Sequence, residues 1–456
     1  MTDIYVTRLP YWSDCRAYYR PLRELPWPVW LDSGFPLSGG GRYDVIAADP
    51  YITLMREDGV TRIARDDGVV ESTTQDLFAC LRRELGAPAR PLADLPFCGG
   101  AIGFLAYDLA RDMGMLPMRA AADAWPHAAI AIYDWAVIVD HARQRSFFVR
   151  QGRDPRAAEH WQSALRRLHA LSAPPAVPDA TTGAMREHGM PLAAYEDGFA
   201  RIQRYIRDGD CYQVNFTQRF RAHVDVDPWT LYQRMRHENP APYGALLEYP
   251  FGQVLSSSPE QFLRLRRGMV QTRPIKGTRP RGDNAEQDLA LRSELLSSAK
   301  DRAENVMIVD LLRNDLGRVC TPGSIDVPQL FEIESFATVH HLVSTVSGRL
   351  SAGRDALDLI AACFPGGSIT GAPKRRAMQI IDELEPVRRE LYCGNVIRLG
   401  FDGDLDSNIM IRTALMRGGE LSYWAGGGIV ADSQCAAEYQ ESLDKAAAFL
   451  RLIGQA

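Results

Sequence analysis

Two segments of the chain carry carboxylates at a spacing that would suit a metal ion. Asp301 and Glu304 stand three residues apart in "KDRAENV", and Glu438 and Glu441 repeat the spacing in "AAEYQES". On a helix, residues three apart share one face, so two such helices would form an oxygen-rich site for a hard cation such as Mg²⁺. Acidic pairs are also common on solvated helix faces, and the spacing alone favours that simpler interpretation.

A lysine stands in an unusually shaped stretch of chain, "QTRPIKGTRP". Lys276 is followed by Gly277, and Pro274 and Pro280 hold the backbone extended on either side. A solvated lysine needs none of these neighbours. Lys276 could be a solvated side chain, a partner in an ion pair, or an amine that burial and nearby cations deprotonate for use as a nucleophile or base. The sequence context alone leaves all three interpretations open.

Two glycine-rich stretches could bring the backbone close to an anionic ligand. "FPGGSITGAP" leads into an expected helix, where amide groups, the helix dipole and the hydroxyls of Ser368 and Thr370 suit a carboxylate or a phosphate. "AGGGIVADS" is expected to be a second such loop, containing Gly426, Gly427 and Gly428. Neither continues as a phosphate-binding GK[ST] motif, and a plain tight turn is the alternative for each.

Three further side chains could take part in chemistry at such a site. Arg412 follows the alternating run "LDSNIMI" and could bind a carboxylate through two guanidinium nitrogens, or stand in water at a strand edge. Glu260 follows a proline at the start of an expected strand and could be a general acid or a surface glutamate. His341 lies in the apolar "ATVHHLVSTV", where a catalytic role competes with that of a buried core histidine.

The elements that would position these residues fall into two halves. Residues 1–171 mix β-rich runs with short amphipathic helices, and "AAIAIYDWAVIVD" predicts a buried strand. Residues 172–189 are rich in Pro, Ala, Thr and Gly without periodicity, so we expect a long loop there. Residues 190–456 form the second half, with one long helix expected near 286–314. Strands and helices come in blocks instead of alternating, which favours mixed or antiparallel sheets.

Composition argues against several classes of protein. The 456 residues carry a net charge of −5, which argues against nucleic-acid binding through general electrostatics. The eight cysteines are scattered with no CxxC pair, which favours a reducing compartment over a disulfide framework. The first residues lack a signal-peptide pattern, and the most apolar run is too short to span a membrane. We therefore expect a cytoplasmic protein that binds neither nucleic acid nor membrane.

Several of these motifs occur together in one known order. "PIKGT", "KDRAENVMIVDLLRNDLGRV", "HHLVSTV", "FPGGSITGAPKRRAMQIIDELEP", "IRT" and "GGGIVADS" together resemble the motifs of the chorismate-utilising enzymes, and the resemblance covers essentially the whole chain. It implies an α+β fold, an anthranilate-synthase-like sandwich of two mostly antiparallel β-sheets with outer helices and an active site in a cleft. It also implies a domain division into an N-terminal component I subdomain at 1–171, a loop at 172–189 and a chorismate-binding catalytic domain at 190–456.

The same resemblance assigns ligands to the candidate residues. It implies that Glu304 and Glu441 bind Mg²⁺ directly, and that Asp301 and Glu438 support the metal through water. It also implies contacts to chorismate from Ser368, Thr370, Tyr392, Arg412 and the backbone of Gly426, Gly427 and Gly428. One departure stands beside these motifs, because Ile397 and Arg398 replace a glycine and a tyrosine that are common in relatives.

The lysine distinguishes the activities within the family. Anthranilate-forming relatives carry alanine at the position of Lys276, whereas those that aminate chorismate carry lysine. The resemblance therefore implies conversion of chorismate and ammonia to 4-amino-4-deoxychorismate, on the route to 4-aminobenzoate and folate. Lys276 would attack ring C2 and Glu260 would protonate the departing C4 hydroxyl. The alternatives are an isochorismate or salicylate-type synthase, in which a lysine acts as a base for water, and an anthranilate synthase component I.

Two partners follow from the resemblance. The chain lacks a glutaminase G-x-C-x-G elbow, so a separate glutamine amidotransferase subunit would supply the ammonia. "LDSG" and "GRYD" match the region in which relatives hold tryptophan, so Ser33 and Tyr43 are candidates for a tryptophan pocket.

Overall fold

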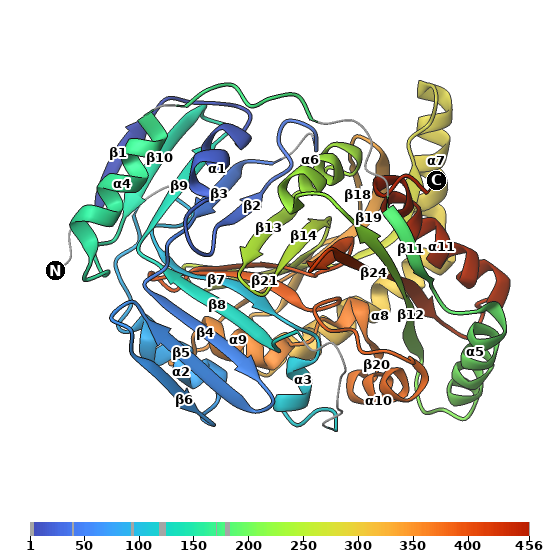
Figure 1. Ribbon diagram of the computed structural model, residues 1–456. Helices are drawn as coiled ribbons and strands as arrows, with labels where there is room; N and C mark the ends of the chain where they lie inside the picture. The colour runs from blue at the N-terminus through green and yellow to red at the C-terminus, as the bar shows by residue number, and fades with distance from the viewer. Residues whose placement is uncertain are drawn as a thin grey trace.

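Two antiparallel sheets form the frame of the molecule. The computed structural model describes residues 4–38, 41–92, 95–117, 125–169, 171–177 and 183–455. These residues form two twelve-stranded sheets, in which every strand pair is antiparallel (Figure 1). The expected α+β sandwich is confirmed. Both sheets take strands from both sides of residues 172–189, so the two halves of the chain share one frame.

The first sheet carries the strand that contains Gly426, Gly427 and Gly428. In spatial order its strands are β1 (Tyr5–Leu9), β10 (Arg145–Arg150), β9 (Trp135–Asp140), β3 (Tyr43–Ala47), β2 (Val29–Asp32), β13 (Tyr243–Tyr249), β14 (Gly252–Ser258), β23 (Thr413–Arg417), β24 (Glu420–Ile429), β12 (Gln213–Val224) and β11 (Gly183–His188), with β20 (Gly371–Ala372) paired to β12.

The second sheet carries the lysine strand at one edge. Its strands are β17 (Ile275–Pro280), β19 (Val339–Arg349), β16 (Met269–Arg273), β15 (Gln261–Arg266), β22 (Leu405–Asn408), β21 (Asn395–Gly400), β7 (Gly100–Leu105), β8 (Ala128–Tyr133), β4 (Ile52–Glu57), β5 (Val60–Arg65) and β6 (Val70–Thr73), with β18 (Asp326–Ser335) paired to β19.

Alternating side chains of the first sheet enter two different cores. Val29 and Val45 belong to the cluster that also contains Ile102 and Ile130 of the second sheet. Their neighbour Trp30 instead joins a cluster on the opposite face. Successive strand residues point to opposite faces, so this alternation places one core between the sheets and another beneath outer helices.

Helices cover both cores. The outer core of the first sheet is covered by α1 (Arg16–Leu22), α4 (Ala157–His169), α6 (Pro228–Glu238) and α11 (Cys435–Leu452). A third cluster lies between β12 and the helices α5 (Leu192–Arg207) and α10 (Lys374–Leu384). The inter-sheet core takes side chains from α2 (Leu77–Leu85), α3 (Leu109–Asp112), α8 (Ala299–Gly317) and α9 (Ala356–Cys363), and a short 3₁₀ turn (Gly367–Ile369) lies beside α8.

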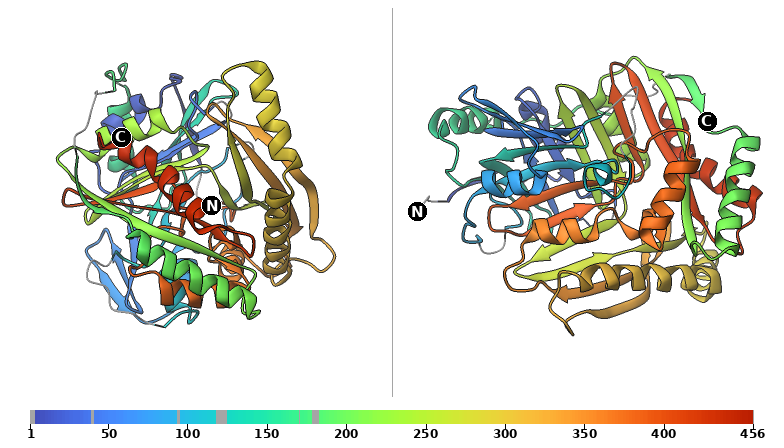
Figure 2. Two further views of the ribbon diagram at one scale, coloured as in Figure 1. Left: turned by 90° about the vertical axis from the view of Figure 1, so that its right-hand side faces the viewer. Right: turned by 90° about the horizontal axis from the view of Figure 1, so that it is seen from below.

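The helix expected near 286–314 is two helices. α7 (Ala285–Ser297) ends and α8 begins at Ser298, whose side chain accepts a hydrogen bond from the Asp301 amide and caps α8. α7 projects beyond the rest of the molecule, and α8 lies along the body as a separate helix (Figures 1 and 2). The prediction of one helix was wrong because a serine in mid-pattern was not recognised as a cap.

Three other segments also differ from expectation. The predicted strand "AAIAIYDWAVIVD" is two strands, β8 and β9, separated at Asp134. Residues 183–188, expected within a loop, form β11 at the edge of the first sheet. The predicted loop at "AGGGIVADS" is a strand as far as Ile429, because these glycines pair with β12 along a continuous ladder. Extended glycines leave no local signal that separates a strand from a loop.

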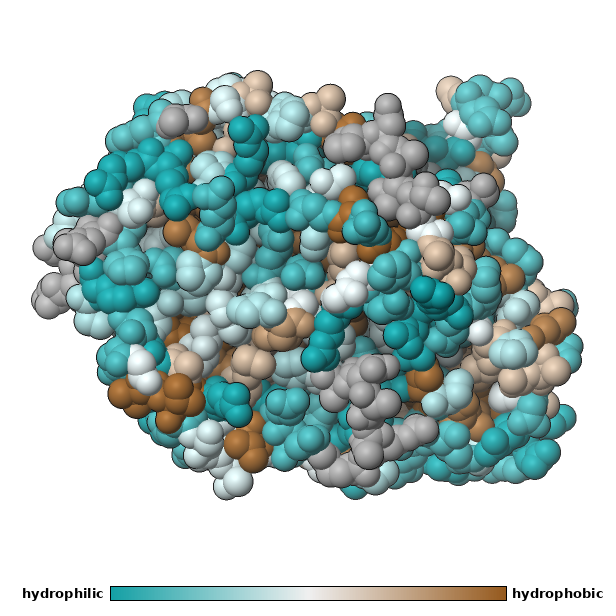
Figure 3. Space-filling view, in the orientation of Figure 1, coloured by the Kyte–Doolittle hydropathy of each residue, from teal (hydrophilic) through white to brown (hydrophobic). Residues whose placement is uncertain are grey.

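The surface shows no extended apolar area in the view of Figure 3. Hydrophilic residues cover most of that face, and the apolar residues on it form separate small patches. Among the described helices, none combines the length and the apolar character that crossing a bilayer requires.

Candidate active site

The backbone at Lys276 bulges out of regular strand pairing. β17 pairs with β19, and the register shifts between Ile275 and Thr278, so Lys276 and Gly277 occupy the irregular part. Gly277 has a φ of +87°, and a Cβ there would lie 2.8 Å from Leu295 and 2.9 Å from Asp301. Glycine is therefore required beside the lysine for both conformation and space.

The Lys276 amine is held against the glycine-rich turn. Its Nζ donates to the Ser368 carbonyl at 3.3 Å. Burial lowers the pKa of Lys276 below its usual value, Glu304 and Glu260 oppose this shift, and Lys445 adds to it. A lowered pKa raises the fraction of neutral amine, which is the nucleophilic form.

Glu260 is a buried carboxyl in contact with the same turn. It lies between β14 and β15 and is 4% exposed. Burial raises the pKa of Glu260 to about 7, although hydrogen bonds from the Ser368 hydroxyl and the Ile275 amide, and the charge of Lys276, pull it down. Ser368 therefore contacts both groups, through its carbonyl to Lys276 and through its hydroxyl to Glu260. The arrangement holds an amine and a protonatable acid side by side.

An ion pair absent from the sequence predictions fixes this turn. Arg389 is fully buried and pairs with Glu385 at 2.6 Å. Its other nitrogen contacts are to the carbonyls of Ile369, at 2.9 Å, and Asn215, at 2.7 Å. Arg389 thus ties the turn to β12. The only sequence signal was the i,i+4 spacing of opposite charges in "ELEPVRR".

Thr370, a predicted substrate contact, is used inside the turn. Its hydroxyl donates to the Gly366 carbonyl at 3.0 Å, and the residue is fully buried. The structure therefore gives this side chain a role in shaping the backbone around Ser368.

The two carboxylates on α11 are paired with lysines. Glu438 is buried and accepts a hydrogen bond from Ser433 at 2.7 Å, with Lys300 3.6 Å away. Glu441 is half-exposed and pairs with Lys445 at 2.6 Å. Burial opposes the charge on Glu441, but Lys445 outweighs it and lowers the pKa of this carboxyl.

The two carboxylates on α8 have different surroundings. Asp301 pairs with Arg279 at 3.1 Å. Burial raises the pKa of Glu304, Lys276 and Lys300 oppose that shift, and the charge of Asp301 adds to it. The four acids do not converge on one point: the described residues contain a single set of three or more possible ligand atoms within 4.8 Å of one another, and it lies elsewhere.

The three glycines lie where β24 approaches α11 and β12. A Cβ on Gly427 would come within 3.2 Å of a Glu438 oxygen and 3.5 Å of a Glu441 oxygen. A Cβ on Gly428 would lie 2.6 Å from the Gln213 side-chain nitrogen. Gln213 is fully buried, and neither of its amide atoms has a hydrogen-bond partner in the described structure. A buried amide without a hydrogen-bond partner costs free energy, which a bound ligand would offset. No sequence pattern indicated that Gln213 would be in this position.

Arg412 and His341 lie near each other. Burial, reinforced by Arg412 and His340, lowers the pKa of His341 to about 4, so its ring is neutral near pH 7. His341 Nδ1 bonds the Thr278 hydroxyl at 2.9 Å, next to the lysine bulge. Arg412 has a φ of +51°, and no hydrogen bond or ion pair from its guanidinium is found among the described residues.

Tyr392 is buried beside β24. Its ring stacks on Trp424 of β24, with the ring centres 6.2 Å apart and the planes inclined by 10°. The contact places it against the strand that carries the three glycines.

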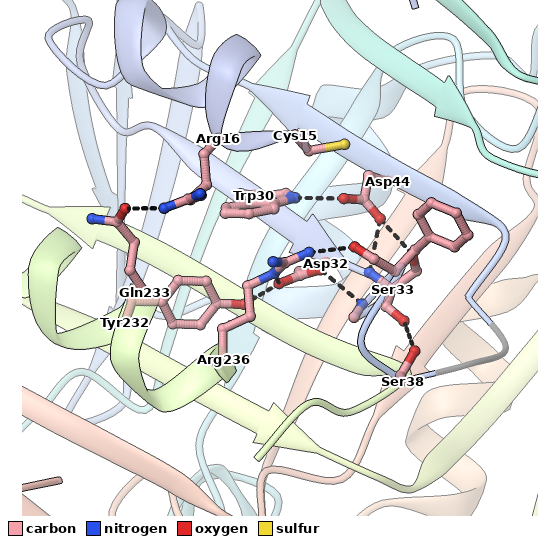
Figure 4. Close-up of polar contacts among 12 residues, drawn as sticks. Cys15, Arg16, Trp30, Asp32, Ser33, Ser38, Asp44, Tyr232, Gln233 and Arg236 are labelled. Carbon is pink, nitrogen blue, oxygen red and sulfur yellow. Dashed lines mark hydrogen bonds and ion pairs between the residues drawn. The ribbon is translucent and has the colours of Figure 1, made fainter. Parts of the chain in front are cut away.

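Ser33 and Tyr43 line a separate cavity of about 420 Å³ between the two sheets. Ile397 and Arg398, the residues that depart from the family pattern, line the same cavity and not the surroundings of Lys276. Arg398 pairs there with Asp406 at 3.3 Å. Ser33 itself is held by Asp44, which accepts bonds from its amide and its hydroxyl (Figure 4).

Comparisons with known proteins identify the family of the chain. A family model described as chorismate binding enzyme matches residues 38–451. Aminodeoxychorismate synthase component 1 of Klebsiella aerogenes is 48% identical over 443 residues, covering 96% of each chain. An anthranilate synthase component 1 of Haloarcula marismortui is 41% identical, covering 80% of this chain and 77% of its own.

A solved structure shows the same fold. Anthranilate synthase component I from Streptococcus pneumoniae superposes with a TM-score of 0.79 at 31% identity, covering 90% of this chain and 92% of that one. The chain belongs to the family of chorismate binding enzymes.

Proposed function

We propose that the chain is the chorismate-aminating component of an aminodeoxychorismate synthase, converting chorismate and ammonia to 4-amino-4-deoxychorismate. The observation that carries this proposal is the pairing of Lys276 and Glu260 through Ser368. An amine with a lowered pKa beside a carboxyl that is half-protonated near pH 7 suits nucleophilic attack assisted by a general acid. The relative from Klebsiella aerogenes carries the same activity in its name.

The proposed reaction proceeds through a covalent lysine adduct. The neutral Lys276 amine attacks ring C2, the ring double bonds shift, and the C4 hydroxyl leaves as water with the proton of Glu260. Ammonia then attacks C4, the double bonds shift back, and Lys276 leaves as the amine. Glu260 regains its proton from the attached ammonium. The net change is chorismate and ammonia to aminodeoxychorismate and water, so both side chains return to their starting states.

We propose that one acidic residue on α8 and one on α11 hold a magnesium ion together with water and substrate oxygens. No hydrogen bond or ion pair of the Glu304 carboxylate is found among the described residues, and burial and Asp301 disfavour its charge, which a divalent cation would relieve. Glu304 and Glu441 would hold the ion, with Asp301 and Glu438 supporting it through water. When bound, Mg²⁺ would neutralise a substrate carboxylate that these acids otherwise repel. The guanidinium of Arg412, which has no hydrogen bond or ion pair among the described residues, would bind the second carboxylate of chorismate.

Release of ammonia from glutamine would require a partner. "Component 1" in the name of the relative implies a second component, and we propose that this partner is a glutamine amidotransferase. The chain itself needs only ammonia, which can be supplied as an ammonium salt.

Product analysis tests the proposed function. The purified chain, incubated with chorismate, Mg²⁺ and an ammonium salt, is expected to form 4-amino-4-deoxychorismate, identified by chromatography and mass spectrometry. Chelation of the metal is expected to stop turnover, and readdition of Mg²⁺ to restore it. Anthranilate or isochorismate as the main product would instead assign one of the two alternative activities.

We also propose that the cavity at Ser33 and Tyr43 binds tryptophan. Its volume of about 420 Å³ suits a ligand of that size, and aromatic and polar side chains line it. Tryptophan is expected to raise the melting temperature of the chain, because a ligand at about 100 times its Kd stabilises a protein by about 2.7 kcal/mol. Calorimetric titration with tryptophan, with phenylalanine as the matched control and Tyr43→Ala as the variant, measures the binding. Equal heats for both amino acids would argue against an indole site.

A further inference from the structure

A thiol, a carboxylate and an imidazole converge in the interior, in a part of the fold that the proposed reaction does not use. Cys15 immediately precedes α1, Asp44 lies on β3, and His141 immediately follows β9. All three side chains are buried, and one donor atom from each lies within 4.8 Å of the other two. Figure 4 shows Asp44 between Trp30 and Ser33, with Cys15 beside it. Three donors of different type thus meet from three separate elements.

The distances match those around a tetrahedral metal ion. Cys15 Sγ lies 3.7 Å from His141 Nε2, and that nitrogen lies 3.5 Å from Asp44 Oδ1. Zinc bound at about 2.3 Å to sulfur and about 2.0 Å to nitrogen and oxygen holds sulfur and nitrogen about 3.5 Å apart and nitrogen and oxygen about 3.3 Å apart. The two measured distances are therefore each only about 0.2 Å longer than those around a zinc ion, and the sulfur and the carboxylate oxygen lie within 4.8 Å of each other.

Neighbouring residues already orient the donors. The Tyr11 hydroxyl lies 3.2 Å from His141 Nδ1, so the imidazole can keep its proton on Nδ1 and present Nε2 to a metal. The Trp30 indole donates to Asp44 Oδ2 at 3.1 Å and fixes the carboxylate. The Phe35 ring stacks on the His141 ring with centres 4.1 Å apart, which sets the plane of the imidazole. Metal-binding side chains in proteins are commonly held by such outer contacts.

The ligand set would balance the charge of a divalent ion. A thiolate, a carboxylate and a neutral imidazole carry two negative charges in total, so the occupied site would add no net charge to the interior. The adjacent Asp32 and Arg236 are paired at 2.6 Å and add no net charge.

The geometry points to a zinc site formed by Cys15, Asp44 and His141, with one position left for a small fourth ligand such as water. Thiolate and imidazole ligands select zinc over magnesium, so this site differs in chemistry from the acidic residues of α8 and α11. Bound zinc would fasten the start of α1 to neighbouring strands of the first sheet. The alternative is a hydrogen-bonded cluster of thiol, carboxylate and imidazole that takes no metal.

Metal analysis of the full chain separates these two possibilities. The chain is first stripped of bound metal and then titrated with Zn²⁺. After desalting, we expect elemental mass spectrometry to find about one zinc ion per chain. Replacement by Co²⁺ is expected to give a thiolate-to-metal charge-transfer band and the visible bands of a four-coordinate ion. Wild-type chain that retains no zinc and gives no cobalt spectrum would overturn the proposal.

A matched pair of variants assigns the ligand. Cys15→Ser is expected to lower zinc affinity by about 100-fold or more and to remove the charge-transfer band. Cys80→Ser is the control, because Cys80 is equally buried but its thiol faces oxygens of Gln75. Cys80→Ser is expected to bind zinc as the wild type does. Zinc retained equally by Cys15→Ser and wild type would place the metal elsewhere and also overturn the proposal.

Discussion

Lys276→Ala is expected to lower the amination of chorismate by at least about 10³-fold, because it removes the proposed nucleophile and leaves water or ammonia to attack unaided. Alanine also removes the bond from Nζ to the Ser368 carbonyl, but it leaves Gly277 and the bulged backbone in place. The fold should therefore persist, with a melting temperature close to that of the wild type. Steady-state formation of aminodeoxychorismate from chorismate and ammonium measures the effect.

Lys276→Arg is the matched control for charge. A guanidinium keeps the positive charge among Glu304, Glu260 and Glu441, but it is never neutral at accessible pH and cannot act as the nucleophile. Both variants are expected to be inactive, and the wild type incubated with chorismate without ammonia should gain the mass of chorismate less water. Substantial amination by Lys276→Arg would assign the lysine an electrostatic role and remove the covalent step.

The sequence indicated the fold and the positions of the charged helices, but not the contacts between distant segments. Carboxylates three residues apart do lie on helices, at Asp301 and Glu304 of α8 and at Glu438 and Glu441 of α11. These are local patterns, and helix periodicity is enough to predict them. The block order of strands and helices favoured mixed or antiparallel sheets, and the described strand pairs are antiparallel.

Tertiary contacts explain what the sequence could not show. The buried pair of Arg389 and Glu385 joins the turn at Ile369 to β12, and this contact exists only in the folded chain. The burial of Glu260 was also hidden, because glutamate is usually exposed and a preceding proline does not indicate otherwise. Thr370 looked like a ligand because of its residue type, yet its hydroxyl bonds the Gly366 carbonyl. In each case the partner is distant in sequence or is a backbone atom.

Ser368 contacts both Lys276 and Glu260, the two side chains proposed to react, and both are buried beside it. Burial disfavours the ammonium form of Lys276 and the carboxylate form of Glu260 alike. Their mutual attraction favours the charged pair, but burial outweighs it for both groups. The pair is thus shifted towards a neutral amine and a neutral acid, which are the two protonation states that the proposed first step consumes.

Glu260→Gln is expected to lower turnover by about 10² to 10⁴-fold, because the amide cannot protonate the departing hydroxyl. Gln is nearly the same size, and its carbonyl oxygen can accept the bonds that Ser368 and the Ile275 amide donate to the native carboxyl. The expected loss is therefore in kcat, with little change in folding. Measured turnover close to that of the wild type would exclude Glu260 as the acid.

The same variant also tests the protonation state of Glu260 without any measurement of activity. The pKa of Glu260 is raised to about 7, above its ordinary value of 4.5, so the fold favours the protonated form. This contribution to stability is fully present below about pH 4.5 and is lost as the pH rises through about 7. Between about pH 4 and about pH 8 the wild type should lose about 3 kcal/mol of unfolding free energy relative to Glu260→Gln.

Denaturant unfolding of both chains at each pH measures that difference, and other titrating groups cancel in the comparison. Glu286→Gln, at an exposed position of α7, is the control for the same substitution outside the buried site. A stability gap between wild type and Glu260→Gln that stays constant with pH would mean that Glu260 has the same pKa of about 4.5 in the folded and unfolded chains and is ionised near pH 7. An ionised Glu260 could not donate a proton, so the general-acid assignment would fail even if turnover had fallen. Loss of turnover together with a gap that widens as the pH rises is the combination that a buried, protonated acid requires.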